Sequence, residues 1–175
     1  VVLYALHNSR FRYYVYKQEN ETVNSNDVTY QPFAGGYIKY SSDGVEYQRH
    51  FDRAVWNVPV SCRHPYGVQS SSYFVLADKG SNELTIFDVN GKVNTLTLKY
   101  PVMQTGVSDK GIVEVILDGG NSSYIQMYDK TGNMIADMKA SVDETGYPVT
   151  AAISPDGSRL AVSFFSIAGI SCNTR

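Results

Sequence analysis

Histidine and cysteine are the residue types in this chain that could hold a metal ion or act as nucleophiles. Among its 175 residues are three histidines, His7, His50 and His64, and two cysteines, Cys62 and Cys172. None has a spacing typical of metal ligands, such as His-x-x-x-His. Cys62 and His64 could form a thiolate–imidazole pair, but residues two apart need not be oriented for proton transfer. We therefore expect neither a metal site nor a cysteine nucleophile.

The two cysteines could pair in an oxidising compartment. Cys62 and Cys172 lie far apart in the sequence, with most of the chain between them. A free thiol or an intermolecular disulfide is therefore favoured over one internal bridge.

Two loops rich in oxygen ligands, residues 78–83 and 118–123, raise the question of calcium. Neither has the spaced carboxylates ending in a bidentate Glu that a calcium loop needs, and Asp and Gly are also ordinary turn residues. The glycine pairs at 35–36 and 119–120 lack the flanking helix of a nucleotide-binding motif. We expect no catalytic residue, no cofactor and no metal.

Aromatic side chains are the better candidates for contact with a ligand. Trp56, the single tryptophan, together with Tyr47, Tyr66 and His64 could stack on a sugar or a peptide. The alternative, which we favour for Trp56, is a ring that fills the wedge between two packed sheets.

The elements that would position these residues form a repeat. An aromatic residue followed four positions later by Gly occurs at residues 40–44, 87–91 and 128–132. A period of about 40–50 residues built from short strands is typical of a β-propeller. Asp43-Gly44 and Asn90-Gly91 predict hairpin turns with positive φ.

A second hairpin signal, at residues 107–111 and 153–157, alternates with the first. Together they predict strands at 102–108, 112–117, 124–129 and 134–140, joined by hairpins into an antiparallel meander. A similar unit covers residues 67–98, and partial units cover 37–51 and the chain from 147 onward. The sequence thus predicts an all-β fold: a partial β-propeller with two full four-stranded blades and two incomplete ones.

Composition limits the partners. The chain has a net charge of −2, a pI of about 5.9 and 43% hydrophobic residues. Nucleic-acid binding would require a basic stripe, and anionic lipid would require a cluster of Lys and Arg. We expect no contact with nucleic acid, and contact with a membrane only through an upstream anchor.

The chain is divided into residues 1–29 and a propeller domain at 30–175. The apolar residues 1–6 could be a first strand or the last turns of a membrane helix, and 18–29 is a polar linker. A ring needs at least about four blades. The chain could be a piece of a longer protein, which we favour, half of a homodimer that closes the ring, or an open arc.

Residues 30–44 resemble the opening blade of an uncharacterised family of membrane-anchored, extracytoplasmic proteins from Gram-positive bacteria, with propeller blades like those of WD repeats. Residues 55–57, 74–80, 146–149 and 154–157 fit the same family. The resemblance implies an N-terminal membrane helix, a location on the outer side of the membrane and a missing C-terminal half. It implies no active-site residues, because none are assigned for this family.

Two functions remain open. The first is a non-catalytic interaction or sensing module that binds a protein, peptide or glycan at the loops between blades, where propellers concentrate their sites. The second is a hydrolase or lyase with a site in the central channel, completed by further blades. We favour the first, because this chain offers few residues for acid–base chemistry.

Overall fold

Four β-sheets make up the fold. The computed structural model describes residues 27–49, 54–141, 143–168 and 171–174, and the regular elements in these ranges are all strands. The first sheet contains β1 (Thr29–Phe33), β2 (Gly36–Tyr40), β3 (Gly44–Gln48) and β4 (Ala54–Pro59). The second contains β5 (Pro65–Gln69), β6 (Tyr73–Asp78), β7 (Glu83–Asp88) and β8 (Gly91–Thr97). The third contains β9 (Val102–Val107), β10 (Val113–Asp118), β11 (Ser122–Tyr128) and β12 (Met134–Ser141). The fourth contains β13 (Tyr147–Ile153), β14 (Leu160–Ala168) and β15 (Ser171–Thr174).

Each sheet is an antiparallel meander in which strands consecutive in sequence pair with each other. The prediction of an all-β partial propeller is confirmed, and the four strands predicted for residues 102–140 lie within two residues of β9 to β12. The structure adds strands β1 and β4 to the first unit and β15 to the last. The sequence signal missed β1 and β4 because each contains a proline, Pro32 or Pro59, which is tolerated in strands at sheet edges.

Turn chemistry explains the aromatic-x-x-x-Gly repeat. The carboxylates of Asp88 and Asp129 accept hydrogen bonds from the backbone N–H groups of Asn90 (2.7 Å) and Thr131 (2.8 Å). The glycines that follow, Gly91 and Gly132, have positive φ, as predicted for Gly91. The turn at residues 41–44 differs, because Gly44 is outside the positive-φ region and the turn closes through a bond from the N–H of Ser41 to the carbonyl of residue 44.

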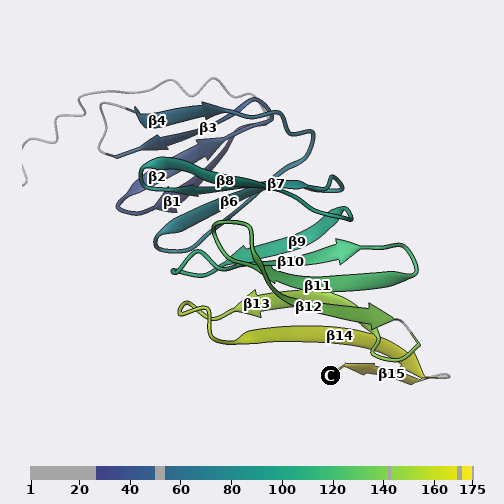
Figure 1. Ribbon diagram of the computed structural model, residues 1–175. Helices are drawn as coiled ribbons and strands as arrows, with labels where there is room; N and C mark the ends of the chain where they lie inside the picture. Colours follow the sequence, from purple (N-terminus) through teal and green to yellow (C-terminus); the bar gives the residue numbers. More distant parts are fainter. Residues whose placement is uncertain (1–26, 50–53, 142, 169–170, 175) are drawn as a thin grey trace, which may run out of the picture.

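The sheets stack in chain order, with the first and fourth at opposite ends of the stack (Figure 1). Three clusters of buried side chains fill the contacts between successive sheets. The cluster between the second and third sheets is the largest, with twelve buried residues that include Val75, Leu84, Val115 and Leu117. The cluster between the third and fourth sheets has four, Ile116, Ile125, Ala140 and Ala151.

Trp56 lies in the contact between the first and second sheets. Its ring stacks on Phe87 with centroids 5.4 Å apart, and its Nε1–H donates to the carbonyl oxygen of Val89 at 3.2 Å. Tyr47 packs beside it, with ring centroids 5.8 Å apart, and is 1% exposed. Trp56 therefore occupies the wedge between blades.

The described residues include no helix long and apolar enough to cross a bilayer. Of the predicted N-terminal segment, residues 1–26 lie outside the described part of the chain, so neither the first strand nor the membrane-helix remnant expected there is tested.

Candidate binding groove

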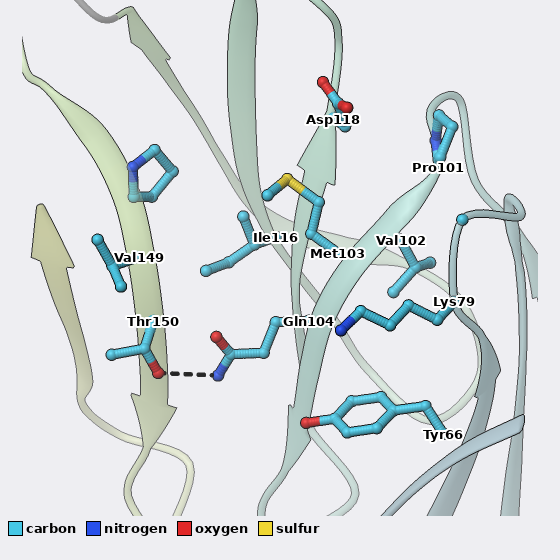
Figure 2. A pocket seen from close by; sticks show the side chains of 12 residues that line it. Tyr66, Lys79, Pro101, Val102, Met103, Gln104, Ile116, Asp118, Val149 and Thr150 are labelled. Atoms are coloured by element: carbon cyan, nitrogen blue, oxygen red, sulfur yellow. Dashed lines mark hydrogen bonds between the residues drawn. The ribbon is translucent and has the colours of Figure 1, made fainter. Parts of the chain in front are cut away.

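The first strand of each sheet stands at its edge, and two adjoining hollows lie along these leading strands, β1, β5, β9 and β13. The larger has a volume of about 590 Å³, and Figure 2 shows its lining. Its residues come from β5, β9, β10, β13 and the loops that follow β6 and β8, and they include Tyr66, Lys79, Met103, Gln104, Asp118 and Val149. The smaller, about 540 Å³, is lined by Asp27, Thr29, Ser42, Arg63, His64 and Pro65, and it shares Tyr66 and Lys79 with the larger. We call the two hollows together the groove.

Asp78, at the end of β6, fixes the segment that carries two of these side chains. Its Oδ1 accepts hydrogen bonds from the backbone N–H groups of Arg63 (3.2 Å) and His64 (2.8 Å). The N–H of Lys79 in turn donates to the carbonyl oxygen of His64 at 3.0 Å. Backbone groups thus hold the loop, and Arg63, His64 and Lys79 are among the residues that line the groove. Asp78 is the first carboxylate of the oxygen-rich loop at residues 78–83, which was considered above as a calcium loop, and it is used for these backbone contacts.

Gln104 joins the third sheet to the fourth in the wall of the groove. Its Nε2–H groups donate to Thr150 Oγ1 at 3.1 Å and to the carbonyl oxygen of Ala151 at 2.9 Å. Lys79 extends its ammonium group into the space between Gln104 and Tyr66 (Figure 2). A cation, a phenol and an amide therefore face one space at the meeting of the two hollows.

The charges of the groove are unevenly placed. Arg63, Lys79 and His64 meet in the smaller hollow, with Asp27 as its one carboxylate among the lining residues. The larger hollow has Asp118 and is otherwise largely apolar apart from Lys79 and Gln104. The smaller hollow is therefore suited to a negative group.

A buried carboxyl group lies close to this wall. Glu114 of β10 is fully buried, and neither of its carboxylate oxygens has a hydrogen-bond partner among the described residues. Burial raises its pKa to about 7. Gly106, its neighbour across the ladder, makes room for it, because a Cβ there would lie 2.5 Å from Glu114 Oε1. The pKa of Tyr66 is raised by burial and by the negative charge of Glu114.

The candidate contact residues from the sequence divide into two pairs. Tyr66 and His64 line the groove, whereas Tyr47 and Trp56 pack between the first and second sheets. Their role as ligand contacts stays a prediction. Sequence reasoning missed Arg63, Lys79 and Gln104, because they come from three different strands or loops and share no local motif. The one available signal was that Arg63 and His64 precede Pro65 in a loop.

Cys62 is poorly suited to nucleophilic chemistry. Its thiol is free and half-buried, and burial, followed by the charges of Asp78 and Glu83, raises its pKa to about 11. A thiol with that pKa stays protonated at neutral pH. Within the described ranges, no three His, Cys, Asp or Glu side chains converge as metal ligands would.

Comparisons with known proteins identify a family and a fold. The profile described as "Family of unknown function (DUF5711)" matches residues 7–175. The search of curated proteins found no match.

Several solved structures, which are β-propellers, resemble this chain in fold. HIRA residues 644–1017 give a TM-score of 0.54 at 12% identity, over 84% of this chain and 51% of that one. BamB from Moraxella catarrhalis gives 0.57 at 18% identity, over 77% of this chain and 42% of that one. Hsv2 from Kluyveromyces lactis gives 0.54 at 13% identity, over 78% and 45%. The chain spans about half the length of the structures it matches.

Proposed function

This chain belongs to the family of unknown function DUF5711, and we propose that it is a non-catalytic propeller module that binds a protein, peptide or glycan. The observation that carries the proposal is the groove, where Tyr66, Lys79 and Gln104 from three different segments face one space. Binding sites are concave, with a few convergent polar groups set among apolar ones, and the groove has this make-up.

The surroundings of the groove support binding without turnover. A hydrolase or lyase would need a general acid or base within reach of the substrate. Glu114 has a pKa near neutrality, but its side chain is fully buried on β10 and does not line either hollow. The Cys62 thiol stays protonated. The groove does contain Asp27, His64 and Asp118, but among the described residues no hydrogen bond joins any two of them as it would in an acid–base pair.

We further propose that the module works outside the cytoplasm, held at the membrane by an upstream anchor. The support for this location is the resemblance of residues 30–44 to the opening blade of membrane-anchored propeller proteins. Partners would then be surface or extracellular proteins, peptides or glycans, met by loops on a rigid scaffold. Fractionation of the source organism, followed by protease treatment of intact cells, tests this location. We expect the protease to digest the protein in intact cells. Resistance of the protein to the protease there would contradict an external location.

A panel of glycans and peptides tested by thermal shift against the purified chain checks the binding proposal. A ligand should raise the unfolding temperature of the wild type and lose this effect in Tyr66→Ala and Lys79→Ala. Lys92→Ala is the matched control, since Lys92 is an exposed cation on β8 outside the groove. Ligands that still stabilise the two groove variants, or turnover of any member of the panel, would overturn the proposal.

A further inference from the structure

We propose that the groove binds an extended acidic peptide segment, with a carboxylate at Arg63, His64 and Lys79 and an apolar side chain over Met103 and Val149. The inference rests on the proposed function, since it takes the groove to be the binding surface. It adds the chemical class of the ligand and the direction in which the ligand lies.

The first argument is the charge of the smaller hollow. Arg63 and Lys79 donate hydrogen bonds through their backbone N–H groups, and their side-chain donors have no hydrogen-bonded partner among the described residues. A guanidinium presents a planar fork of donors that matches a carboxylate, and such charge-assisted bonds are about twice as strong as neutral ones. One acidic side chain seated there would meet the cations of Arg63 and Lys79 and the ring of His64, against the single carboxylate of Asp27.

The second argument is the apolar surface of the larger hollow. Val149 is 57% exposed and lies at a bulge of β13, where the register against β14 shifts and leaves it without a strand partner. Met103 and Ile116 line the hollow beside it. A methionine thioether adapts to differently shaped apolar groups. This surface suits a Leu-like or Met-like side chain.

The third argument is the acceptor between the two ends, which together with the apolar surface favours a peptide over an acidic sugar. Gln104 uses its Nε2–H groups on the fourth sheet, and its Oε1 accepts no hydrogen bond from the described residues. That oxygen is therefore available as an acceptor for a peptide N–H between the charged and apolar ends. A sugar would find the cations and the ring of Tyr66, but it would leave the Met103 and Val149 surface without a matching group.

The two hollows share Tyr66 and Lys79, so a ligand that contacts both must extend across these side chains. Fluorescein-labelled pentapeptides of the sequence Ala-Glu-Ala-Leu-Ala, with Glu→Gln and Leu→Ser versions, are the probes for fluorescence polarisation with the 175-residue chain. We expect the acidic, leucine-containing peptide to bind at least tenfold more tightly than either altered peptide. Its affinity should fall with added salt, because the contact is ionic.

Variants of the protein complete the test. Arg63→Gln combined with Lys79→Gln should weaken binding of the acidic peptide at least tenfold and remove its preference over the Gln version. Val149→Asp should remove the preference for Leu over Ser. Lys92→Gln is the control, and unfolding temperatures within about 2 °C of the wild type show that the variants are folded.

The outcomes separate this inference from the proposed function. If the Gln peptide or a neutral glycan binds as tightly and Tyr66→Ala abolishes that binding, the groove is a binding site but the acidic-peptide inference is wrong. A uronic-acid oligosaccharide that binds where the peptides do not also overturns it. If no peptide or glycan binds, both proposals fall.

Discussion

The contact between the second and third sheets differs from the contact between the third and fourth at one matched position. Val75 of β6 lies opposite Ile86 of β7, and Glu114 of β10 lies opposite Met127 of β11. Both side chains are fully buried. Val75 belongs to the twelve-residue apolar cluster, whereas Glu114 shares its face of β10 with Ile116 of the smaller cluster. A carboxyl group thus replaces a hydrocarbon at the same place in the meander.

The difference between Val75 and Glu114 follows from the first strand of each sheet, β5 or β9. Val75 pairs across the ladder with Val68, which has a side chain of its own, whereas Glu114 pairs with Gly106, which leaves space. The groove opens along the contact that contains the carboxyl, since Gln104, Ile116 and Thr150 line it. Natural proteins depart from good packing rules mostly near functional sites. We therefore interpret the contact between the third and fourth sheets, which has the smaller apolar cluster, as the less stable of the two contacts.

Val75→Glu would give the contact between the second and third sheets the buried carboxyl that Glu114 gives the other contact, and it should have the largest effect. An unpartnered carboxyl in the twelve-residue cluster should lower the free energy of unfolding by about 4 kcal/mol at pH 7, as measured in urea. Val75→Ala separates the lost packing from the carboxyl and should lose about 2 kcal/mol. Equal losses for the two variants would mean that the apolar character of this contact is unimportant.

Truncation of one leucine in each contact compares the two cores directly. Leu117 is fully buried in the larger cluster, and Leu117→Ala should cost about 3 kcal/mol. Leu160 packs against the smaller cluster and is only partly buried, so Leu160→Ala should cost less than half as much. Urea unfolding of both variants tests the ranking, and a larger loss for Leu160→Ala contradicts it.

Replacement of Glu114 by Gln should stabilise the protein at alkaline pH. The pKa of Glu114 rises from its ordinary 4.5 to about 7 on folding, so the folded state retains a proton that the unfolded state releases. Stability therefore falls as pH rises through this window and levels off above about pH 7. Glu114→Gln should remove that slope and gain up to about 3 kcal/mol at pH 8. Thermal unfolding between pH 4.5 and 8 checks both, and an unchanged slope assigns it to other groups.

The smallest expected effect concerns the polar link between the third and fourth sheets. Gln104→Ala removes two hydrogen bonds, to Thr150 and Ala151, and should cost about 1 kcal/mol because the site is partly exposed. Hydrogen exchange of β13 amides should speed up while amides of β6 stay unchanged. Faster exchange in β6 as well would indicate that the two contacts open together.

The sequence predicted the sheets where turn chemistry marks them. Asp88 with Gly91, and Asp129 with Gly132, close hairpins by local side-chain bonds, which are visible in a single segment. Strand β4 lacked such a marker. Most of its side chains are exposed and none is fully buried, so no pattern of core residues identifies it in the sequence.

The groove was less predictable for a physical reason. Tyr66 and His64 were found as aromatic or titratable residues, but Lys79, Gln104 and Thr150 meet only after three sheets stack. Glu114 lies within an apolar run from Ile112 to Leu117, where a single polar residue is expected to face solvent. Its burial depends on the fourth sheet, which covers β10 from a distant part of the chain.

The buried carboxyl also changes how the molecule would respond to an electric field. Residue counting gives a net charge of −2 at pH 7, but a group with a pKa of about 7 carries only half a charge there. The folded protein should therefore migrate as a less negative particle than its unfolded chain, with the gap widest near pH 6 and closing on either side. Native electrophoresis beside urea-gel electrophoresis would record this difference as a change of effective charge, which is the product of mobility and friction.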